Sequence, residues 1–350
     1  MKQRIRIVLF LILVFLGIAY LYHERPEIFE DLRPSPYALD IVYASDMHYL
    51  SQQLTDNGER FQEFSLSKGP KVMVYIDEIM EAFCDRMEKE QPDLVILGGD
   101  LTFFAEYLSH LDLIEKLERI EDAGIPVIVI PGNHDVGYYE ARSYSDEDGF
   151  ERTEEADPED FRELYDRFGP ESALSVCDDS FSYLYEVNEE LAVLSIDANA
   201  QEEEDRISEE TLSWAEEALE LAEEEDRTVI AVLHEPLFVH DEDDEALSVT
   251  DRAEELQELF SEYGVQTVFS GHLHYQSRRE EDGITEYVTS SLAIYPHYYG
   301  QIRYDRGRVS YRYTRLNVSE WAAEQGLENE DLLHFDEYSR GVTRKWWEQR

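Results

Sequence analysis

Short runs of apolar, mostly β-branched residues recur along the chain, and each run ends at polar residues that can carry chemistry. Uninterrupted runs of this length are typical of strands that are buried on both faces of a sheet. They predict strands over residues 38–44, 93–97, 126–130, 191–196, 228–233 and 265–269. Segments with apolar residues at helical spacing and glutamate-rich outer faces lie between them, at residues 72–89, 111–123 and 207–225. Because strands alternate with helices, the sequence predicts an α/β fold.

Two segments depart from this alternation. Residues 140–180 are acidic and loop-like around a short helix predicted at 160–168. They come soon after the end of a predicted strand, so we expect a cap-like insertion over the strand ends, where α/β folds place ligands. Residues 284–316 have a strand pattern, and the tail at 317–350 has the pattern of an amphipathic helix. The sequence therefore predicts one large domain over residues 38–316. The role of the helical tail does not follow from its sequence.

The N-terminus carries a separate signal. Three positive residues, Lys2, Arg4 and Arg6, precede an apolar run from residue 7 to residue 22. Positive charge before such a run predicts a cytoplasmic N-terminus and an exported body. We therefore expect residues 1–25 to form a transmembrane signal anchor that contacts the lipid bilayer through residues 7–22, with the rest of the chain outside the cytoplasm.

Two alternatives remain for this segment, because sixteen apolar residues are few for a membrane span. Cleavage after Ala19, with Gly17 at the −3 position, would make the segment a signal peptide and the protein secreted. A buried core helix is the other alternative. Residues 26–37, which contain three prolines, are expected to form a linker.

Composition narrows the classes of function. The chain has 350 residues, of which 43% are hydrophobic, which is enough to bury a large core and excludes wholesale disorder. Its 80 acidic and 30 basic residues give a net charge of −50, which argues against nucleic acid as a partner. The two cysteines, Cys84 and Cys177, are too few for a disulfide framework or a cysteine-rich zinc site, and the sequence leaves their pairing open.

The polar residues at the strand ends form an ordered series of short motifs. They are Asp46-x-His48, Gly99-Asp100, Gly132-Asn133-His134-Asp135, His234 and Gly271-His272-x-His274. Each motif alone is typical of a turn or a cap, but the whole series needs a common explanation. Imidazoles, carboxylates and an amide oxygen suit transition metals such as Mn, Fe, Zn or Ni better than an all-oxygen site for Ca or Mg. Because the donors exceed the needs of one ion, the series predicts two divalent metal ions.

These residues resemble the calcineurin-like metallophosphoesterases. The likeness spans residues 40–315 and rests on the stretches ASDMHYLS, LVILGGDLT, VIVIPGNHD and FSGHLH. It extends to exported, membrane-anchored bacterial members through DFRELYDRFG and AEELQELFSEYGVQTVFSGH. The resemblance implies an αββα sandwich of two mixed β-sheets flanked by helices, after the N-terminal apolar helix. One departure is Glu235, where many members have a second histidine after the ligand.

The resemblance also implies how the metals are held. Asp46, His48 and His274 would bind one ion, Asn133, His234 and His272 the other, and Asp100 would bridge the two. A carboxylate suits the bridge because it has two oxygens and a negative charge. The single residue between the last two histidines would send both side chains to one side of an extended segment. Ions ~3.5–4 Å apart would hold a bridging hydroxide as the nucleophile for attack at phosphorus.

The resemblance assigns His134 a catalytic role without a metal. It would stabilise the phosphorus transition state and protonate the leaving oxygen. Asp135 is predicted to orient or charge that imidazole, and a turn carboxylate that caps the next segment is the alternative. His240 and His297 could touch substrate, although positions on the surface or a pocket rim explain them as well. Asp197, which also ends a predicted strand, is interpreted as structural.

The sequence thus predicts a dinuclear-metal phosphoric ester hydrolase for a small phosphorylated substrate. Monoesters, diesters and nucleotide-sugar pyrophosphates all stay open, because fold and metals do not define the substrate. An inactive scaffold of the same fold and an acidic protein that binds cations loosely are the alternatives. The complete series of ligands together with His134 favours the enzyme. Neither the identity of the metals nor the oligomeric state follows from the sequence.

Overall fold

The structure, a computed structural model, describes residues 35, 37–137, 141–147, 149–200, 206–240 and 249–350. The predicted N-terminal anchor and most of the predicted linker lie outside these residues. The chain divides into the units Met1–Ala38 and Leu39–Arg350, and the helices and strands of the described residues belong to the second unit. Within the described ranges, no helix combines the length and apolar character needed to cross a membrane.

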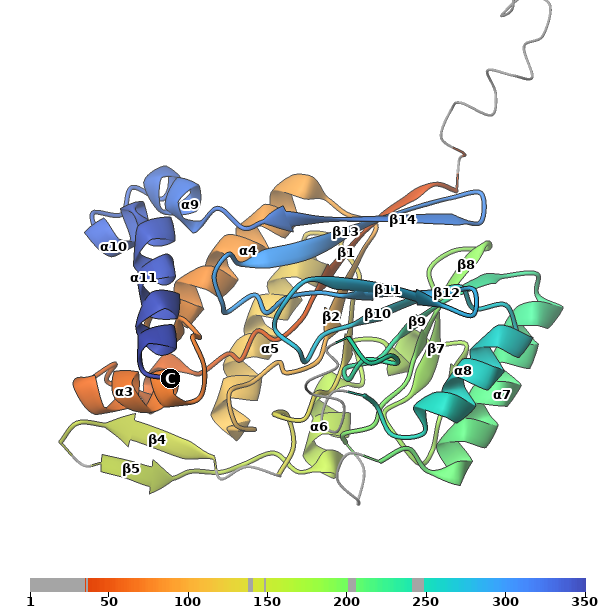
Figure 1. Cartoon of the computed structure of the whole chain (residues 1–350), viewed down its shortest axis with the longest axis horizontal. Coiled ribbons are helices and arrows are strands. Elements are labelled where there is room, and N and C mark those ends of the chain that lie inside the picture. The colour runs from red at the N-terminus through yellow and green to blue at the C-terminus, as the bar shows by residue number, and fades with distance from the viewer. Residues whose placement is uncertain (1–34, 36, 138–140, 148, 201–205, 241–248) are drawn as a thin grey trace, which may run out of the picture. The chain divides into compact units, whose positions relative to one another are not determined.

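The first sheet contains strands from both ends of this unit, in the order β14-β13-β1-β2-β3 (Figure 1). Its members are β1 (Leu39–Ala44), β2 (Leu94–Gly98), β3 (Val127–Ile130), β13 (Tyr298–Asp305) and β14 (Arg308–Arg315). The first three strands are parallel, whereas β13 runs antiparallel to β1, and β14 antiparallel to β13. Because β1, β2 and β3 are parallel, the residues that follow them meet at one edge of the sheet.

The second sheet has the order β11-β12-β10-β9-β8-β7-β6. Its parallel strands are β8 (Leu191–Ser195), β9 (Thr228–Val232), β10 (Thr267–Ser270) and β12 (Ile284–Val288). Its antiparallel edges are β11 (Ser277–Glu281) on one side and β7 (Tyr183–Glu186) and β6 (Ser175–Val176) on the other. Both sheets are therefore mixed, as the resemblance implied.

Alternate residues of the second sheet enter two different buried clusters. Leu191 and Val193 of β8 belong to the cluster that contains the first sheet, α4 (Ile76–Glu90) and α5 (Tyr107–Asp122). Ala192 and Leu194 pack instead with α7 (Glu209–Glu224) and α8 (Ala253–Glu262). Each of these strands is thus buried on both faces, which confirms the predicted sandwich of sheets flanked by helices.

The predicted strands and long helices are all present, with ends that shift by a few residues. The helix predicted from residue 72 begins with the 3₁₀ turn η2 (Met73–Tyr75) before α4, and α5 begins four residues before the predicted start at 111. The short helix predicted at 160–168 is α6 (Pro158–Tyr165). It begins early because Asp157 and Asp160 form a capping box around Pro158 at the first helical position.

Several elements were not predicted as such. A helix, α3 (Glu59–Ser67), follows the 3₁₀ turn η1 (Gln52–Leu54), and the hairpin of β4 (Arg142–Ser145) and β5 (Gly149–Arg152) lies beside it (Figure 1). Phe64 of α3 stacks on Tyr144 of this hairpin with ring centroids 5.5 Å apart. A third 3₁₀ turn, η3 (Pro170–Ser172), follows α6. The role of residues 140–180 as a cap stays a prediction.

The tail folds into α9 (Val318–Glu324), α10 (Glu330–Leu333) and α11 (Phe335–Glu348). Val318, Leu332 and Phe335 belong to the same buried cluster as the first sheet, so the tail packs on the body of the unit.

The two cysteines are both buried and free.

Candidate metal centre

The seven predicted ligands follow the ends of five strands from the two sheets. Asp46 and His48 come after β1, Asp100 after β2, Asn133 after β3, His234 after β9, and His272 and His274 after β10. Main-chain hydrogen bonds join these loops, such as Asp46 N to Gly99 O at 3.0 Å and Gly271 N to His234 O at 3.0 Å. The side chains are therefore held by a rigid frame at one edge of both sheets.

Most of the ligands sit on backbone that proteins rarely use. The left-handed residues are Asp46 at φ 55°, His48 at 47°, Asp100 at 51°, His272 at 63° and His274 at 59°. Left-handed backbone costs non-glycine residues ~1–3 kcal/mol each and persists where the surroundings impose it. The prediction of an extended segment around His272 and His274 is therefore wrong, because the chain bends there.

Two glycines allow the loops to approach so closely. A Cβ atom on Gly132 would overlap the backbone nitrogen of Asp100, and one on Gly271 would overlap the hydroxyl of Ser45. Both positions therefore need the smallest residue.

The first half of the centre consists of Asp46, His48, Asp100 and His274. One ligand atom from each lies within 4.8 Å of the others. The Nε2 atoms of His48 and His274 are 3.0 Å apart, and the His274 atom is also 3.2 Å from Asp46 Oδ1. The Nε2 atom of His48 lies 3.5 Å from Asp100 Oδ2. Four potential ligand atoms for a metal ion thus face a common point.

The second half is built around His234, Asn133 and His272. His234 Nδ1 lies 2.8 Å from the carbonyl oxygen of Gly98, which can only accept, so this nitrogen carries the proton. In the neutral ring that binds a metal ion, its Nε2 atom then has a free lone pair, and this atom lies 3.2 Å from Asn133 Oδ1 and 3.2 Å from Asp100 Oδ1. His272 Nδ1 is 3.0 Å from the same amide oxygen.

This arrangement fits two cations. Acceptor atoms that face one another in a buried site repel, whereas a cation between them is attracted to all of them. Asp100 is 2% exposed and directs Oδ2 to the first half and Oδ1 to the second, which is the disposition that a bridging carboxylate needs. The residues present therefore fit the predicted pair of divalent metal ions, whose identity the donor set leaves open.

His134 lies beside the bridge with its ring fixed on two sides. Its Nδ1 donates to the carbonyl oxygen of Phe103 at 2.5 Å, and its ring stacks on Phe104 with centroids 5.2 Å apart. Its Nε2 lies 4.0 Å from Asp100 Oδ2, and burial lowers the pKa of the imidazole to about 4. In the neutral ring Nε2 carries a lone pair, so proton donation to a leaving group requires that a bound phosphate first favours the charged form.

The carboxylate of Asp135 binds the backbone of its own turn and of the loop that follows β2. Its carboxylate accepts hydrogen bonds from the backbone nitrogens of Leu101 at 3.0 Å, Thr102 at 2.8 Å and Gly132 at 2.8 Å. It thereby ties the loop after β2 to the loop after β3. Burial, with the nearby charge of Asp100, raises the pKa of Asp135 to about 7. A positioning role through these loops follows from the contacts, and a direct catalytic role stays a prediction.

The other polar residues singled out in the sequence lie in structural positions. His240 contacts Ser277 Oγ at 2.7 Å and Glu286 Oε2 at 3.0 Å, and its side chain is 1% exposed. His297 is fully buried and its Nδ1 lies 2.9 Å from the carbonyl oxygen of Leu292. His240 lines a pocket together with residues of β11, which agrees with the pocket-rim alternative, whereas the surface alternative is wrong for the buried His297. Asp197 accepts hydrogen bonds from two backbone nitrogens of its own turn and from the backbone nitrogen of Phe181 in the bend before β7, which agrees with a structural role.

Sequence reasoning missed Lys71, which precedes η2. The residue is 5% exposed, and its ammonium donates to the carbonyl oxygen of Lys68 at 3.4 Å but forms no ion pair within the described ranges. Burial lowers its pKa to about 8, whereas the charges of Asp100 and Asp46 raise it. A lone lysine outside any motif gives no signal in the sequence, and only the fold brings it near the ligands.

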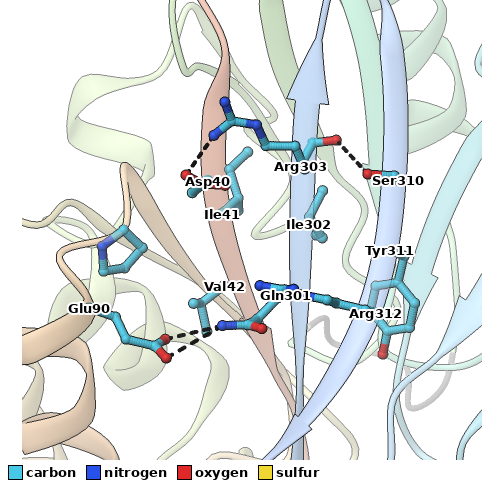
Figure 2. A pocket seen from close by; sticks show the side chains of 11 residues that line it. Asp40, Ile41, Val42, Glu90, Gln301, Ile302, Arg303, Ser310, Tyr311 and Arg312 are labelled. Carbon is cyan, nitrogen blue, oxygen red and sulfur yellow. Dashed lines mark hydrogen bonds and ion pairs between the residues drawn. The ribbon is translucent and has the colours of Figure 1, made fainter. Parts of the chain in front are cut away.

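A cavity of about 550 Å³ lies away from this centre (Figure 2). Its lining includes Asp40 at the start of β1, Glu90 at the end of α4, and residues of β13 and β14 such as Arg303 and Arg312. It contains none of the predicted ligands.

Comparison with known proteins adds to this geometry. A family model described as "Calcineurin-like phosphoesterase" matches residues 39–276. The chain is 25% identical over 262 residues to the Bos taurus protein "Serine/threonine-protein phosphatase CPPED1", covering 69% of this chain and 74% of that one.

Two solved structures share the fold. A dimetal phosphatase from Danio rerio aligns with a TM-score of 0.56 at 13% identity, over 81% of this chain and 100% of its own. Purple acid phosphatase PPD1 from yellow lupin (Lupinus luteus) seeds aligns with a TM-score of 0.50 at 16% identity, over 81% of this chain and 52% of its own.

Proposed function

The chain belongs to the calcineurin-like phosphoesterase family, and from this premise we propose that it hydrolyses phosphoester bonds with a dinuclear metal centre. The observation that supports the proposal best is the convergence of buried acceptor atoms around Asp100. Its two carboxylate oxygens lie 3.5 Å from His48 Nε2 and 3.2 Å from His234 Nε2. An inactive scaffold is not favoured, because all seven ligand positions and His134 are occupied by the residue types that the chemistry needs.

The ligand residues and His134 have different proposed roles. Asp46, His48 and His274 would hold one ion, Asn133, His234 and His272 the other, with Asp100 between them. When bound, two divalent ions supply Lewis acidity and activate water. Phe103 and Phe104 hold the ring of His134 beside Asp100, and its Nε2 would donate a hydrogen bond to a phosphoryl or leaving oxygen once a bound phosphate favours the charged imidazole. Asp135 fixes the loop that contains His134 to the loop that contains the bridging residue Asp100.

The proposed substrates are small phosphomonoesters or phosphodiesters. The net charge of −50 opposes the approach of a polymeric nucleic acid. Because the bovine relative is named a serine/threonine-protein phosphatase, phosphoserine and phosphothreonine peptides belong among the monoesters to be tested.

We also propose that the catalytic unit acts outside the cytoplasm, anchored through residues 7–22. The support is the order of charge in the sequence, with Lys2, Arg4 and Arg6 before the apolar run and the acidic body after it. Protease added to intact cells that express the full chain should digest the body. Full protection would reverse the proposed topology, and release with Tyr20 as the new N-terminus would establish a secreted form instead.

The metal centre is tested on the full chain by elemental analysis and by a screen with added Mn²⁺. We expect two ions per chain and hydrolysis of at least one of p-nitrophenyl phosphate, bis-p-nitrophenyl phosphate or a phosphopeptide. One ion held by only three or four of the seven residues, located by anomalous scattering, would contradict the dinuclear centre.

A further inference from the structure

Glu235 follows the ligand His234 directly and lies at the second half of the centre. It is 8% exposed. One of its carboxylate oxygens lies within 4.8 Å of a ring nitrogen of His234 and of His272. This is the position at which the sequence departs from the second histidine of many family members, so the family pattern assigns it no role as a ligand.

The carboxylate of Glu235 is held from one side only. Its Oε2 accepts a hydrogen bond from Asn199 Nδ2 at 3.0 Å, and the Asn199 backbone is itself fixed by a hydrogen bond to Asp197 Oδ1 at 2.6 Å. Its Oε1 is buried and has no hydrogen-bond partner within the described ranges. A buried carboxylate oxygen without a hydrogen-bond donor costs free energy, and a cation held by the neighbouring His234 and His272 would offset that cost.

The charges of the two halves point to a cation as that partner. The first half has a carboxylate of its own, Asp46, in addition to the shared Asp100. The predicted ligands of the second half, Asn133, His234 and His272, supply no negative charge. With Glu235 each half has one carboxylate of its own and a share of the bridge. The three carboxylates would then distribute their negative charge evenly between the two divalent ions.

We propose that Glu235 is an additional ligand of the second metal ion, oriented by Asn199. This inference rests on the proposed dinuclear centre. It assigns that ion an oxygen-rich set with two carboxylates, where the family pattern has only the bridge, and so predicts tighter binding of the second ion than neutral ligands would support.

The test is a metal-binding titration, independent of turnover. The metal-free full chain is titrated with Co²⁺ against a competing chelator, and the affinities of the two sites and their visible absorption are recorded. Glu235→Gln should weaken the second site by ~10-fold or more, a loss of the size that metal sites show when a supporting group is removed, and should change its absorption band. The first site should keep its affinity.

Three further variants make the result specific. Glu225→Gln removes the same charge from an exposed position and should leave both sites unchanged. Asn199→Ala should weaken only the second site, because it frees the orientation of Glu235. Glu235→Asp serves where the Gln variant does not fold, since it keeps the charge but shortens the reach, and it should also weaken the second site alone.

The outcomes separate this inference from the proposed function. If the wild-type chain binds fewer than two ions, the dinuclear centre itself is wrong. If it binds two ions and both Glu235 variants retain the affinity and absorption of the second site, the dinuclear centre stands and Glu235 is not a ligand. Equal weakening of both sites in Glu235→Gln would also overturn the assignment to the second ion.

Discussion

Strand β1 connects two regions of opposite character, and two aspartates at its ends show the difference. Asp40, at the start of the strand, has a side chain that is 70% exposed and pairs with Arg303 at 2.5 Å. Asp46, just past the other end, is fully buried and faces His274 Nε2 at 3.2 Å. The first pair lines the cavity of Figure 2, and the second belongs to the metal centre.

The cavity has volume, but most of the polar groups that line it already have partners. Glu90 accepts hydrogen bonds from Gln301, and Arg303 pairs with Asp40, as Figure 2 shows. Exposed pairs of this kind contribute ~0–1 kcal/mol and leave little to bind a ligand. The centre has the reverse arrangement, because its buried acceptors face one another and need cations. Convergence of buried groups therefore identifies a functional site better than empty space does.

The largest expected effect comes from the bridge. Asp100→Asn keeps the shape of the side chain but removes the charge shared by both halves, so we expect loss of both metal ions and of hydrolysis together. Elemental analysis and the ester assay measure the two losses on one preparation. Retention of two ions with normal turnover would contradict the bridging role.

The next effect concerns His134, which lies in the centre but is not a predicted ligand. His134→Ala should keep both ions and a folded unit while turnover falls ~10²–10⁴-fold on an alkyl phosphate, whose leaving group needs a proton. The loss should be smaller with p-nitrophenyl phosphate, whose leaving group scarcely needs one. Equal losses on both substrates would leave only electrostatic stabilisation, and loss of metal would make His134 a ligand.

Glu106 shows the effect of burial without a neighbouring group of metal ligands. It is fully buried but belongs to neither group of candidate ligands. Burial raises the pKa of its carboxyl from 4.5 to about 8, so the folded protein keeps a proton that the unfolded chain loses near its ordinary pKa. Stability should therefore fall as the pH rises between these two values and level off above the higher one. In Glu106→Gln this part of the slope should disappear.

The free energy of unfolding, measured with denaturant at several values between ~pH 5 and 9, tests this effect of Glu106. Metal content should stay at the wild-type value in the Gln variant, because the residue contacts none of the ligands. Parallel stability profiles of the two proteins would show that Glu106 is ionised in the folded state.

The smallest effect is expected in the cavity. Arg303→Ala breaks its ion pair with Asp40 and should change stability by less than ~1 kcal/mol and leave metal content and ester hydrolysis unchanged. Thermal unfolding and the same assays test this. A loss of hydrolysis comparable to that of His134→Ala would mean that the cavity serves the reaction, and the comparison above would fail.

Much of the fold was predictable because its strands are long apolar runs with distinct ends. The runs that became β1, β2, β3, β8, β9 and β10 are buried on both faces, and few other structures accommodate such runs. The same ends placed the candidate ligands, because residues that follow parallel strands meet at one edge. Helix α3 and the β4–β5 hairpin were missed, since their short, charged sequences have no clear period.

The details of the site were less predictable. The spacing of His272 and His274 suggested an extended segment, but both residues adopt left-handed backbone that their surroundings impose. Asp135 was expected to orient or charge the His134 imidazole or to cap the next segment, yet its carboxylate binds backbone nitrogens of another loop, over 30 residues away in the chain. Contacts of this kind depend on how separate loops pack, which local sequence does not encode.

The sequence by itself determined the strand-and-helix order, the residue types at the strand ends and hence the class of chemistry, because apolar periodicity and ligand chemistry are local properties. Only the tertiary structure decided which donors face which, since distances between loops follow from the packing of two sheets. It placed the two oxygens of Asp100 toward different histidines and left a buried oxygen of Glu235 without a partner. It also buried Lys71 near the carboxylates of the centre, where burial lowers the pKa of its ammonium to about 8 although the charges of Asp100 and Asp46 act in the opposite direction.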